Sequence, residues 1–277
     1  MESMDTSIFT EIDTARTADE AVHQIESLIL EGVLRVGDRL PGERELARQF
    51  SISRPILRDA LKTLEARGLI AARHGGGTYV ADVIGQVFTQ PVMDLIATHK
   101  KATADYLEYR REVEGVAAEY AARRATADDR ALLTRTIERM RQAHGSDDFA
   151  EEAAIDVEFH NLVGECAHNI ILLHTLRSCY RLLADGVFYN RALIYAFPGA
   201  RDKLLAQHEA IYNAIMASDP DAARRAAQAH IGFVETSMAE AERMSDWERV
   251  SKLRLQSRGG RDTDQAETED NEEDVPS

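Results

Sequence analysis

The stretch from Glu43 to Val80 reads ERELARQFSISRPILRDALKTLEARGLIAARHGGGTYV. Its first eight residues place apolar side chains at Leu46, Ala47 and Phe50, which is the period of a short amphipathic helix. The segment Ser51-Ile52-Ser53 interrupts that period. We therefore predict a short helix followed by a tight turn.

A second helix is predicted to begin near Arg54, because Ser53 suits the N-cap position and Pro55 fits the first turn. Arg54 and Arg58 lie four residues apart on one side of this helix, and Gly68 ends it. The opposite side is apolar and is formed by Leu57, Ala60, Leu61 and Leu64. One face of the helix thus belongs to a core, and the other face is cationic.

Two short strands are predicted next, at residues 69–72 and 78–81. They are joined by the glycine-rich segment 73–77, in which glycine permits a tight hairpin tip. An earlier amphipathic stretch, residues 21–29, supplies a third helix to close a small core. Three helices followed by a hairpin form a winged helix-turn-helix.

Positive charge is concentrated in this module. Between Arg44 and Arg73 there are seven Lys or Arg residues against three Asp or Glu, whereas the whole chain has a formal net charge of −15. A local excess of cations is what binding to the phosphates of duplex DNA requires. The sequence therefore predicts a DNA-reading function for this module.

The motifs Leu40-Pro41-Gly42-Glu43-Arg44-Glu45-Leu46-Ala47, Ser53-Arg54-Pro55-Ile56-Leu57-Arg58-Asp59-Ala60-Leu61 and Gly75-Gly76-Gly77-Thr78-Tyr79-Val80 resemble the GntR family of bacterial transcription regulators. The resemblance implies a homodimer whose two recognition helices address the half-sites of a palindromic operator in double-stranded DNA. It also implies contacts to base edges and phosphates from the second helix, and to the minor groove or backbone from the wing. The DNA-binding residues so implied are Arg44, Ser53, Arg54, Pro55, Arg58, His74 and Gly75.

The rest of the 277-residue chain has room for a second domain. From about residue 103 to residue 243 the helical period is almost continuous, which predicts an all-α bundle. Its expected helices are 103–126, 128–144, 147–167, 169–197, 200–217 and 219–243, with Asp128 and Asp219 as helix starts. The fold class we expect is mainly α, a winged helix-turn-helix followed by this bundle.

We expect a flexible N-terminus at residues 1–18, the DNA-binding domain at 19–82 and a linker at 83–100. The helical effector and dimerisation domain should then span 101–247, and an acidic, disordered tail 248–277. No apolar run approaches the length of a membrane span, and the acidic N-terminus lacks the apolar core of a signal peptide. Only two cysteines occur, Cys166 and Cys179. These observations favour a cytoplasmic protein without membrane partners.

The bundle contains a set of possible metal ligands. Asp156 and His160 are four residues apart and share a helical face, while His208 and His230 fall in two later helices. An Asp-x3-His pair followed by two such histidines resembles the metal-binding version of the FCD domain, which follows the winged helix in the FadR-like branch of GntR regulators. The resemblance implies a divalent ion, with zinc expected first and nickel or manganese as alternatives.

An open coordination position on such an ion can hold a small organic acid effector, for example lactate, pyruvate, glycolate or a sugar acid. By the same resemblance, we expect effector contacts from Arg110 and Asn169. Arg110 lies one turn before Glu114, so an exposed ion pair between these two residues is the alternative. Effector binding is expected to change operator affinity through the linker. We expect the effector to release repression.

Two enzyme functions are the alternatives to a regulator. The His-Gly-Gly-Gly at 74–77 also occurs in the oxyanion loop of some esterases, but no Gly-x-Ser-x-Gly nucleophile motif follows. A metal-dependent hydrolase using the Asp/His set is the second alternative; His208-Glu209 begins like a zinc-protease motif, but Tyr212 stands where the second histidine belongs. RNA binding is disfavoured because aromatic stacking motifs are missing. We therefore expect a metabolite-responsive transcription regulator, not an enzyme.

Overall fold

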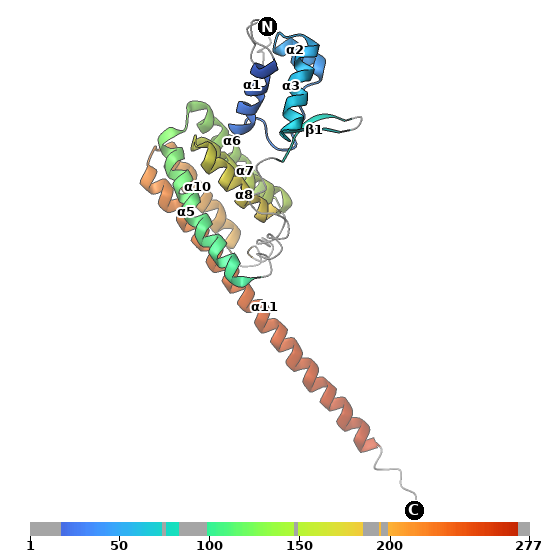
Figure 1. Ribbon diagram of the computed structural model, residues 1–277. Helices are drawn as coiled ribbons and strands as arrows, with labels where there is room; N and C mark the ends of the chain where they lie inside the picture. The colour runs from blue at the N-terminus through green and yellow to red at the C-terminus, as the bar shows by residue number, and fades with distance from the viewer. Residues whose placement is uncertain are drawn as a thin grey trace, which may run out of the picture.

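The computed structural model describes residues 18–73, 76–82, 99–146, 149–184, 194 and 199–270. A small winged domain sits against one side of an all-helical bundle, and one long helix leaves the bundle in the opposite direction (Figure 1). The expected fold class is confirmed. The expected N-terminal segment and most of the expected linker lie outside the described residues.

The winged domain is built from α1 (Ala18–Leu30), α2 (Glu43–Gln49), α3 (Arg54–Ala66), β1 (Ile70–Arg73) and β2 (Gly77–Val80). The strands pair antiparallel, with Ile70 opposite Val80 and Arg73 opposite Gly77. A compact apolar core holds these elements together, and its fully buried members include Ile25, Leu46, Phe50, Leu57 and Leu64. These residues occupy the apolar positions of the helical periods seen in the sequence. Each helix therefore buries one apolar face, and the three faces together form the core of the domain.

The helix ends differ in detail from the simplest expectation. Ser53 lies at the N-cap of α3 with extended backbone, but its side chain makes no capping hydrogen bond. Gly68 has φ +72° and follows the last turn of α3, where the Leu69 N–H donates to the Leu64 carbonyl. This left-handed glycine is the usual way to end a helix and turn the chain into a strand.

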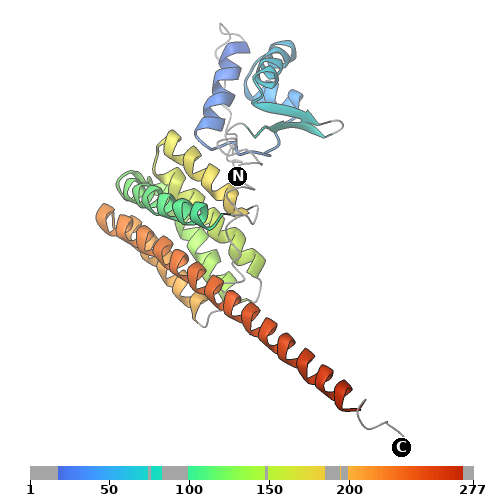
Figure 2. The ribbon, with the colours of Figure 1, turned by 60° about the horizontal axis from the view of Figure 1, so that its bottom comes forward.

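The bundle consists of α5 (Lys100–Arg124), α6 (Ala127–His144), α7 (Phe149–Cys166), α8 (Ile170–Ala184), α10 (Ala200–Met216) and α11 (Pro220–Asp270). The long pair α5 and α11 run side by side (Figures 1 and 2). Small residues permit this close approach: a Cβ placed on Gly115 of α5 would lie 2.9 Å from the Cγ of Gln228 on α11. The central core is filled by larger side chains that include Leu133, Ile137, Ile155, Phe159 and Leu176.

Capping explains where two of these helices start. Thr126, rather than the expected Asp128, caps α6 and forms a reciprocal capping box with Asp129. Asp219 caps α11 as expected, because its Oδ1 accepts from the Ala222 N–H at 2.9 Å.

The expectation of a disordered tail from residue 248 is wrong for most of its length, because α11 continues to Asp270 (Figure 2). This part of the helix leaves the bundle, so Trp247 and Leu255 are 66% and 74% exposed. Helical hydrogen bonds are local, and a helix already formed on the bundle adds residues without needing a tertiary partner. Among the described helices, none is long and apolar enough to span a bilayer.

Candidate metal centre and nucleic-acid interface

The four predicted metal ligands meet inside the bundle. Asp156 and His160 come from α7, His208 from α10 and His230 from α11, and one ligand atom of each lies within 4.8 Å of the others. All four residues are buried. Helical spacing brings the α7 pair onto one face, and packing of α10 and α11 against the same interior brings the other two.

Hydrogen bonds at Nδ1 define the tautomers of two of these histidines. His208 Nδ1 lies 2.8 Å from the Leu204 carbonyl oxygen, and His230 Nδ1 lies 3.2 Å from Gln207 Oε1. Both oxygens can only accept, so each Nδ1 must carry the proton and donate. The Nε2 atom of each ring then carries the lone pair through which a histidine binds a metal.

His160 is oriented by an ion pair behind it. Its Nδ1 lies 2.7 Å from Glu114 Oε2, while the other carboxylate oxygen of Glu114 accepts from Arg110 Nε. Burial alone would raise the pKa of Glu114, but Arg110 and His160 together hold it below the ordinary value. The carboxylate is therefore ionised and directs His160 Nε2 toward the cluster.

The resulting contacts fit a bound cation. His160 Nε2 and His208 Nε2 are 3.2 Å apart, and His208 Nε2 is 3.1 Å from Asp156 Oδ1. These short contacts gather ring nitrogens and a carboxylate oxygen around one point, where a positive charge between them would be stabilised. Burial and the two neighbouring histidines hold the pKa of His230 well below its ordinary value, so that ring stays neutral. The donor set, three imidazoles and one carboxylate, suits zinc and similar divalent ions.

A small space adjoins the ligands. A cavity of about 30 Å³ is lined by Asp156 and His208 together with Glu152 and Arg201. Arg201 Nη2 lies 2.6 Å from Glu152 Oε1, so this neighbouring cation is already paired. The space holds about one water-sized group.

The two expected effector residues have other roles in this arrangement. Arg110 is 3% exposed and is paired with Glu114. The pair is therefore buried and not exposed, and the Arg110 guanidinium already has a carboxylate partner. The Asn169 side chain accepts a hydrogen bond from the Leu172 N–H and caps α8.

Sequence reasoning missed the groups that support the ligands. The sequence pattern indicates Glu114 only as a partner of Arg110, and it does not single out Gln207 or Leu204. Tyr180 of α8 was also missed; its ring centroid lies 5.9 Å from that of His160, and the Arg110 guanidinium lies 5.5 Å from the tyrosine ring centroid. The position of Gln207 beside His208 was the one available signal, and it carries no meaning until the helices are packed.

The candidate DNA interface is the exposed face of α3. The side chains of Arg54 and Arg58 are 56% and 54% exposed. Both reach the same carboxylate on α2: Arg58 Nε lies 2.8 Å and Arg54 Nη2 3.6 Å from Glu43 Oε2. These contacts hold the pKa of Glu43 below its ordinary value, with the hydrogen bond from Arg58 the largest cause. The two arginines are accessible, and a single acidic residue partly neutralises them.

Three further predicted DNA contacts, Arg44, Ser53 and Pro55, are also exposed on the winged domain. His74 and Gly75, the predicted wing contacts, lie outside the described residues. The described part of the wing keeps an arginine close to its tip, because the Arg73 guanidinium lies 4.4 Å from the centroid of the Tyr79 ring.

Comparison with known proteins agrees with this division of the chain. Residues 17–80 match the family of bacterial regulatory proteins described as the gntR family, and residues 105–233 match the FCD domain. A protein of Escherichia coli strain K12 assigned as an L-lactate dehydrogenase operon regulator is 37% identical over 80% of this chain and 86% of its own.

The Glc operon transcriptional activator of the same organism is 34% identical over 83% of this chain and 92% of its own length. Among solved structures, a GntR protein of Streptococcus agalactiae aligns with 79% of this chain and 99% of its own, at 26% identity and a TM-score of 0.49. The family and these relatives are transcription regulators, and nothing in them supports the hydrolase alternative.

Proposed function

We propose, for a chain that belongs to the gntR family of bacterial regulatory proteins and carries an FCD domain, that a small carboxylate bound at a metal site controls its affinity for operator DNA. Membership of the family makes the protein a DNA-binding transcription regulator and not an enzyme. The metal, the effector, the homodimer, the palindromic operator and cytoplasmic location belong to the proposal.

On the DNA side, α3 is the recognition helix. Arg54 and Arg58 are exposed, lie one turn apart and project away from the core face of Leu57. A helix of this kind enters the major groove, where arginine binds guanine edges or phosphates. In a homodimer, two such helices would read two half-sites of a palindrome.

On the metal side, Asp156, His160, His208 and His230 would hold one divalent ion, with zinc the first candidate. The observation that carries this assignment is that the Nδ1 atoms of all three histidines are engaged by acceptors, so that three Nε2 lone pairs face one another beside a carboxylate. A bound ion supplies a positive centre that attracts a carboxylate. The chain itself orients the rings and excludes bulk water.

For the effector we propose a short 2-hydroxy carboxylate, with L-lactate as the first candidate. One relative is assigned as the regulator of an L-lactate dehydrogenase operon, and a carboxylate matches the positive charge of an occupied metal site. The adjoining space of about 30 Å³ is too small for such a molecule beside the ligands. Effector binding should therefore move α7 and α10 apart.

A direct route can carry this movement to the DNA-binding domain. α8 approaches the metal cluster through Tyr180 and contacts the winged domain through His174, whose Nε2 lies 2.8 Å from the Leu30 carbonyl oxygen. Arg177 of the same helix packs against Gly32, where a Cβ would lie 2.8 Å from its Nη2 atom. We infer that α8 transmits the effector signal in addition to the linker, and that effector binding weakens operator binding.

The test uses protein purified without chelators and an operator selected from random duplex DNA. Elemental analysis should find about one divalent ion per chain, and His208→Ala should lose it. L-Lactate at 100 times its dissociation constant should stabilise the wild-type protein by about 2.7 kcal/mol and release the operator. The matched control is His23→Ala, at an exposed position on α1, which should behave as wild type.

Each part of the proposal can fail separately. A metal-free wild-type protein would exclude the metal centre. A metal-loaded protein that ignores L-lactate and other short hydroxy acids would exclude the effector class but keep the metal. Normal effector response in His208→Ala would show that the response does not pass through the metal.

A further inference from the structure

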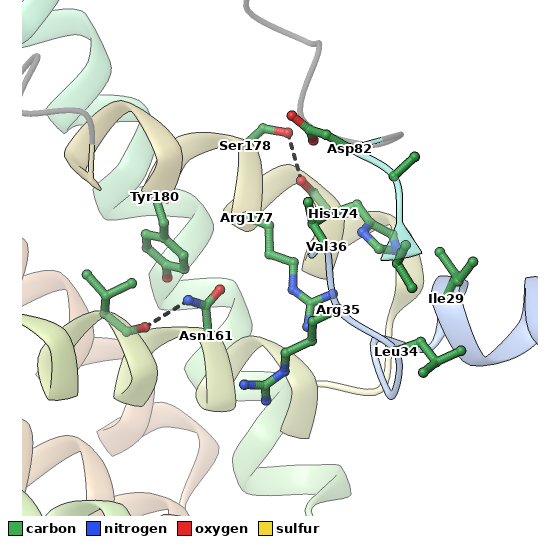
Figure 3. A pocket seen from close by; sticks show the side chains of 13 residues that line it. Ile29, Leu34, Arg35, Val36, Asp82, Asn161, His174, Arg177, Ser178 and Tyr180 are labelled. Carbon is green, nitrogen blue, oxygen red and sulfur yellow. Dashed lines mark hydrogen bonds between the residues drawn. The ribbon is translucent and has the colours of Figure 1, made fainter. Parts of the chain in front are cut away.

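A second, larger cavity lies between the two domains (Figure 3). Its volume is about 240 Å³. The winged domain contributes residues from the end of α1, the following loop and the end of β2, and the bundle contributes residues from α7 and α8. The walls are mainly apolar and include Ile29, Leu34, Val80 and Val157.

One buried polar atom at this cavity has no partner. His174 is 9% exposed and lines the cavity, and its Nε2 must donate to the Leu30 carbonyl oxygen at 2.8 Å. Burial lowers the pKa of His174, so the ring is neutral and Nδ1 is a bare acceptor. Within the described part of the chain, His174 Nδ1 is a buried nitrogen without a hydrogen-bond partner. Such an atom is costly unless a donor reaches it.

The charges around the cavity are balanced. Arg35 and Arg177 both bind the carboxylate of Glu165, at 2.9 and 2.7 Å, and Asp82 lines the cavity as a second carboxylate. Two cations facing two anions leave no charge excess for an ionic ligand to neutralise. This differs from the metal cluster, where a bound ion attracts an acid.

We propose that this interdomain cavity is a binding site for a small uncharged alcohol or phenol, whose hydroxyl donates to His174 Nδ1 and whose apolar body packs on the walls. The volume suits a molecule of roughly ten non-hydrogen atoms or fewer. Because the walls come from both domains, an occupant favours the arrangement in which the domains touch.

The site is separate from the proposed metal and effector site. Tyr180 lines the cavity and is 3% exposed, and its ring lies against His160. The tyrosine ring therefore stands between the cavity and the metal ligands. The proposal requires neither a metal ion nor a carboxylate effector, so its failure leaves the proposed function untouched.

Two fluorinated probes can test the site by ¹⁹F NMR titration of the full chain. 4-Fluorophenol carries the hydroxyl donor, and fluorobenzene has nearly the same ring without it. We expect 4-fluorophenol to bind on the order of 3- to 10-fold more tightly than fluorobenzene, the contribution of one hydrogen bond to a buried acceptor. His23→Ala, at an exposed position on α1, should leave both affinities unchanged.

Two variants separate the hydroxyl contact from the space. His174→Gln keeps an N–H near the position of Nε2 for Leu30 but removes the Nδ1 acceptor, so it should abolish the preference for 4-fluorophenol and retain fluorobenzene binding. Val157→Phe should fill the cavity and abolish binding of both probes. Equal affinity for the two probes in wild type, a preference that survives His174→Gln, or unchanged binding in folded Val157→Phe would each overturn the proposal.

Discussion

The Nδ1 atom of His160 lies 2.7 Å from Oε2 of Glu114, although the two residues belong to different helices and are 46 positions apart. Glu114 is itself held by Arg110, so a buried ion pair stands behind one of the candidate metal ligands. The Arg110–Glu114 pair therefore supports a candidate metal ligand. Neither an exposed ion pair nor an effector contact would have this role. The pair orients the imidazole toward the other candidate metal ligands.

Glu114→Gln should weaken metal affinity by roughly 10- to 100-fold, because a neutral amide supports the His160 imidazole less well than a carboxylate. Competition with a chelator of known affinity measures the effect. The control is Glu119→Gln on the same helix. Glu119 lies away from the cluster, and its Oε2 is 2.9 Å from Arg224 Nη1.

The Glu114→Gln protein should also be less stable, because buried Arg110 loses its counter-charge. Breaking a buried pair costs about 3–5 kcal/mol. Denaturation of the metal-free proteins separates this loss from the loss of metal. Unchanged chelator competition in a folded Glu114→Gln protein would refute the supporting role.

Arg54→Ala and Arg58→Ala should each weaken operator binding by about 1–3 kcal/mol per site and leave thermal stability almost unchanged. Both side chains are more than half exposed, so the core does not depend on them. Fluorescence anisotropy with the selected operator gives the affinities. Arg225→Ala, an exposed arginine on α11, removes the same charge from the other domain and should have little effect.

Glu43→Gln should strengthen operator binding, because this carboxylate competes with DNA for Arg54 and Arg58 in the free protein. The gain should not exceed about 1 kcal/mol, the range of exposed ion pairs, and should shrink as salt is added. Operator titrations at two ionic strengths test both statements. Weaker binding in Glu43→Gln would mean that the carboxylate positions the arginines for DNA instead of competing for them.

The interdomain contact at His174 should weaken in acid. Burial and the charge of Arg177 lower the pKa of this ring below the ordinary value of about 6.5, against the opposing effect of the Leu30 carbonyl. The unfolded chain then binds more protons than the folded one. The stability that His174 contributes is therefore fully present above about pH 6.5 and is lost as pH falls through that value toward the folded pKa.

Urea unfolding of metal-free protein at about pH 7.5 and about pH 5.5 measures this dependence. His174→Gln, which does not titrate, should lose less free energy of unfolding between the two pH values than wild type. The exposed His23→Gln is the control. Identical pH dependence in wild type and His174→Gln would exclude His174 as the titrating group.

Deletion of residues 258–277 should leave the fold and the melting temperature unchanged. This segment carries eight acidic residues against Arg258 and Arg261 and has Val275 as its one large apolar residue, so it offers no apolar face to bury. The deletion removes about six net negative charges, so operator binding, measured in parallel, should tighten slightly. A drop of several degrees in melting temperature would show that the segment docks.

Local features of the chain were sufficient to predict the winged domain. Leu46, Phe50 and Leu57 are buried where the helical period placed them, and Gly68 and the strands around the wing fall within one or two residues of the expected positions. Each of these features depends on neighbours a few residues away, so the sequence alone encodes them. The same holds for Asp156 and His160, which share a helical face at any packing of the bundle.

Only the tertiary structure decided how the ligands are supported and how the domains touch. The contacts of Glu114 with His160, of Gln207 with His230 and of His174 with Leu30 depend on the rotation and crossing of helices that are far apart in sequence. Side-chain packing between helices sets that rotation, and no local period encodes it. The sequence thus determined the two domains and the four candidate ligands. Helix packing determined which ring nitrogens face the cluster and which helix contacts the DNA-binding domain; the helices concerned are α5, α7, α8, α10 and α11.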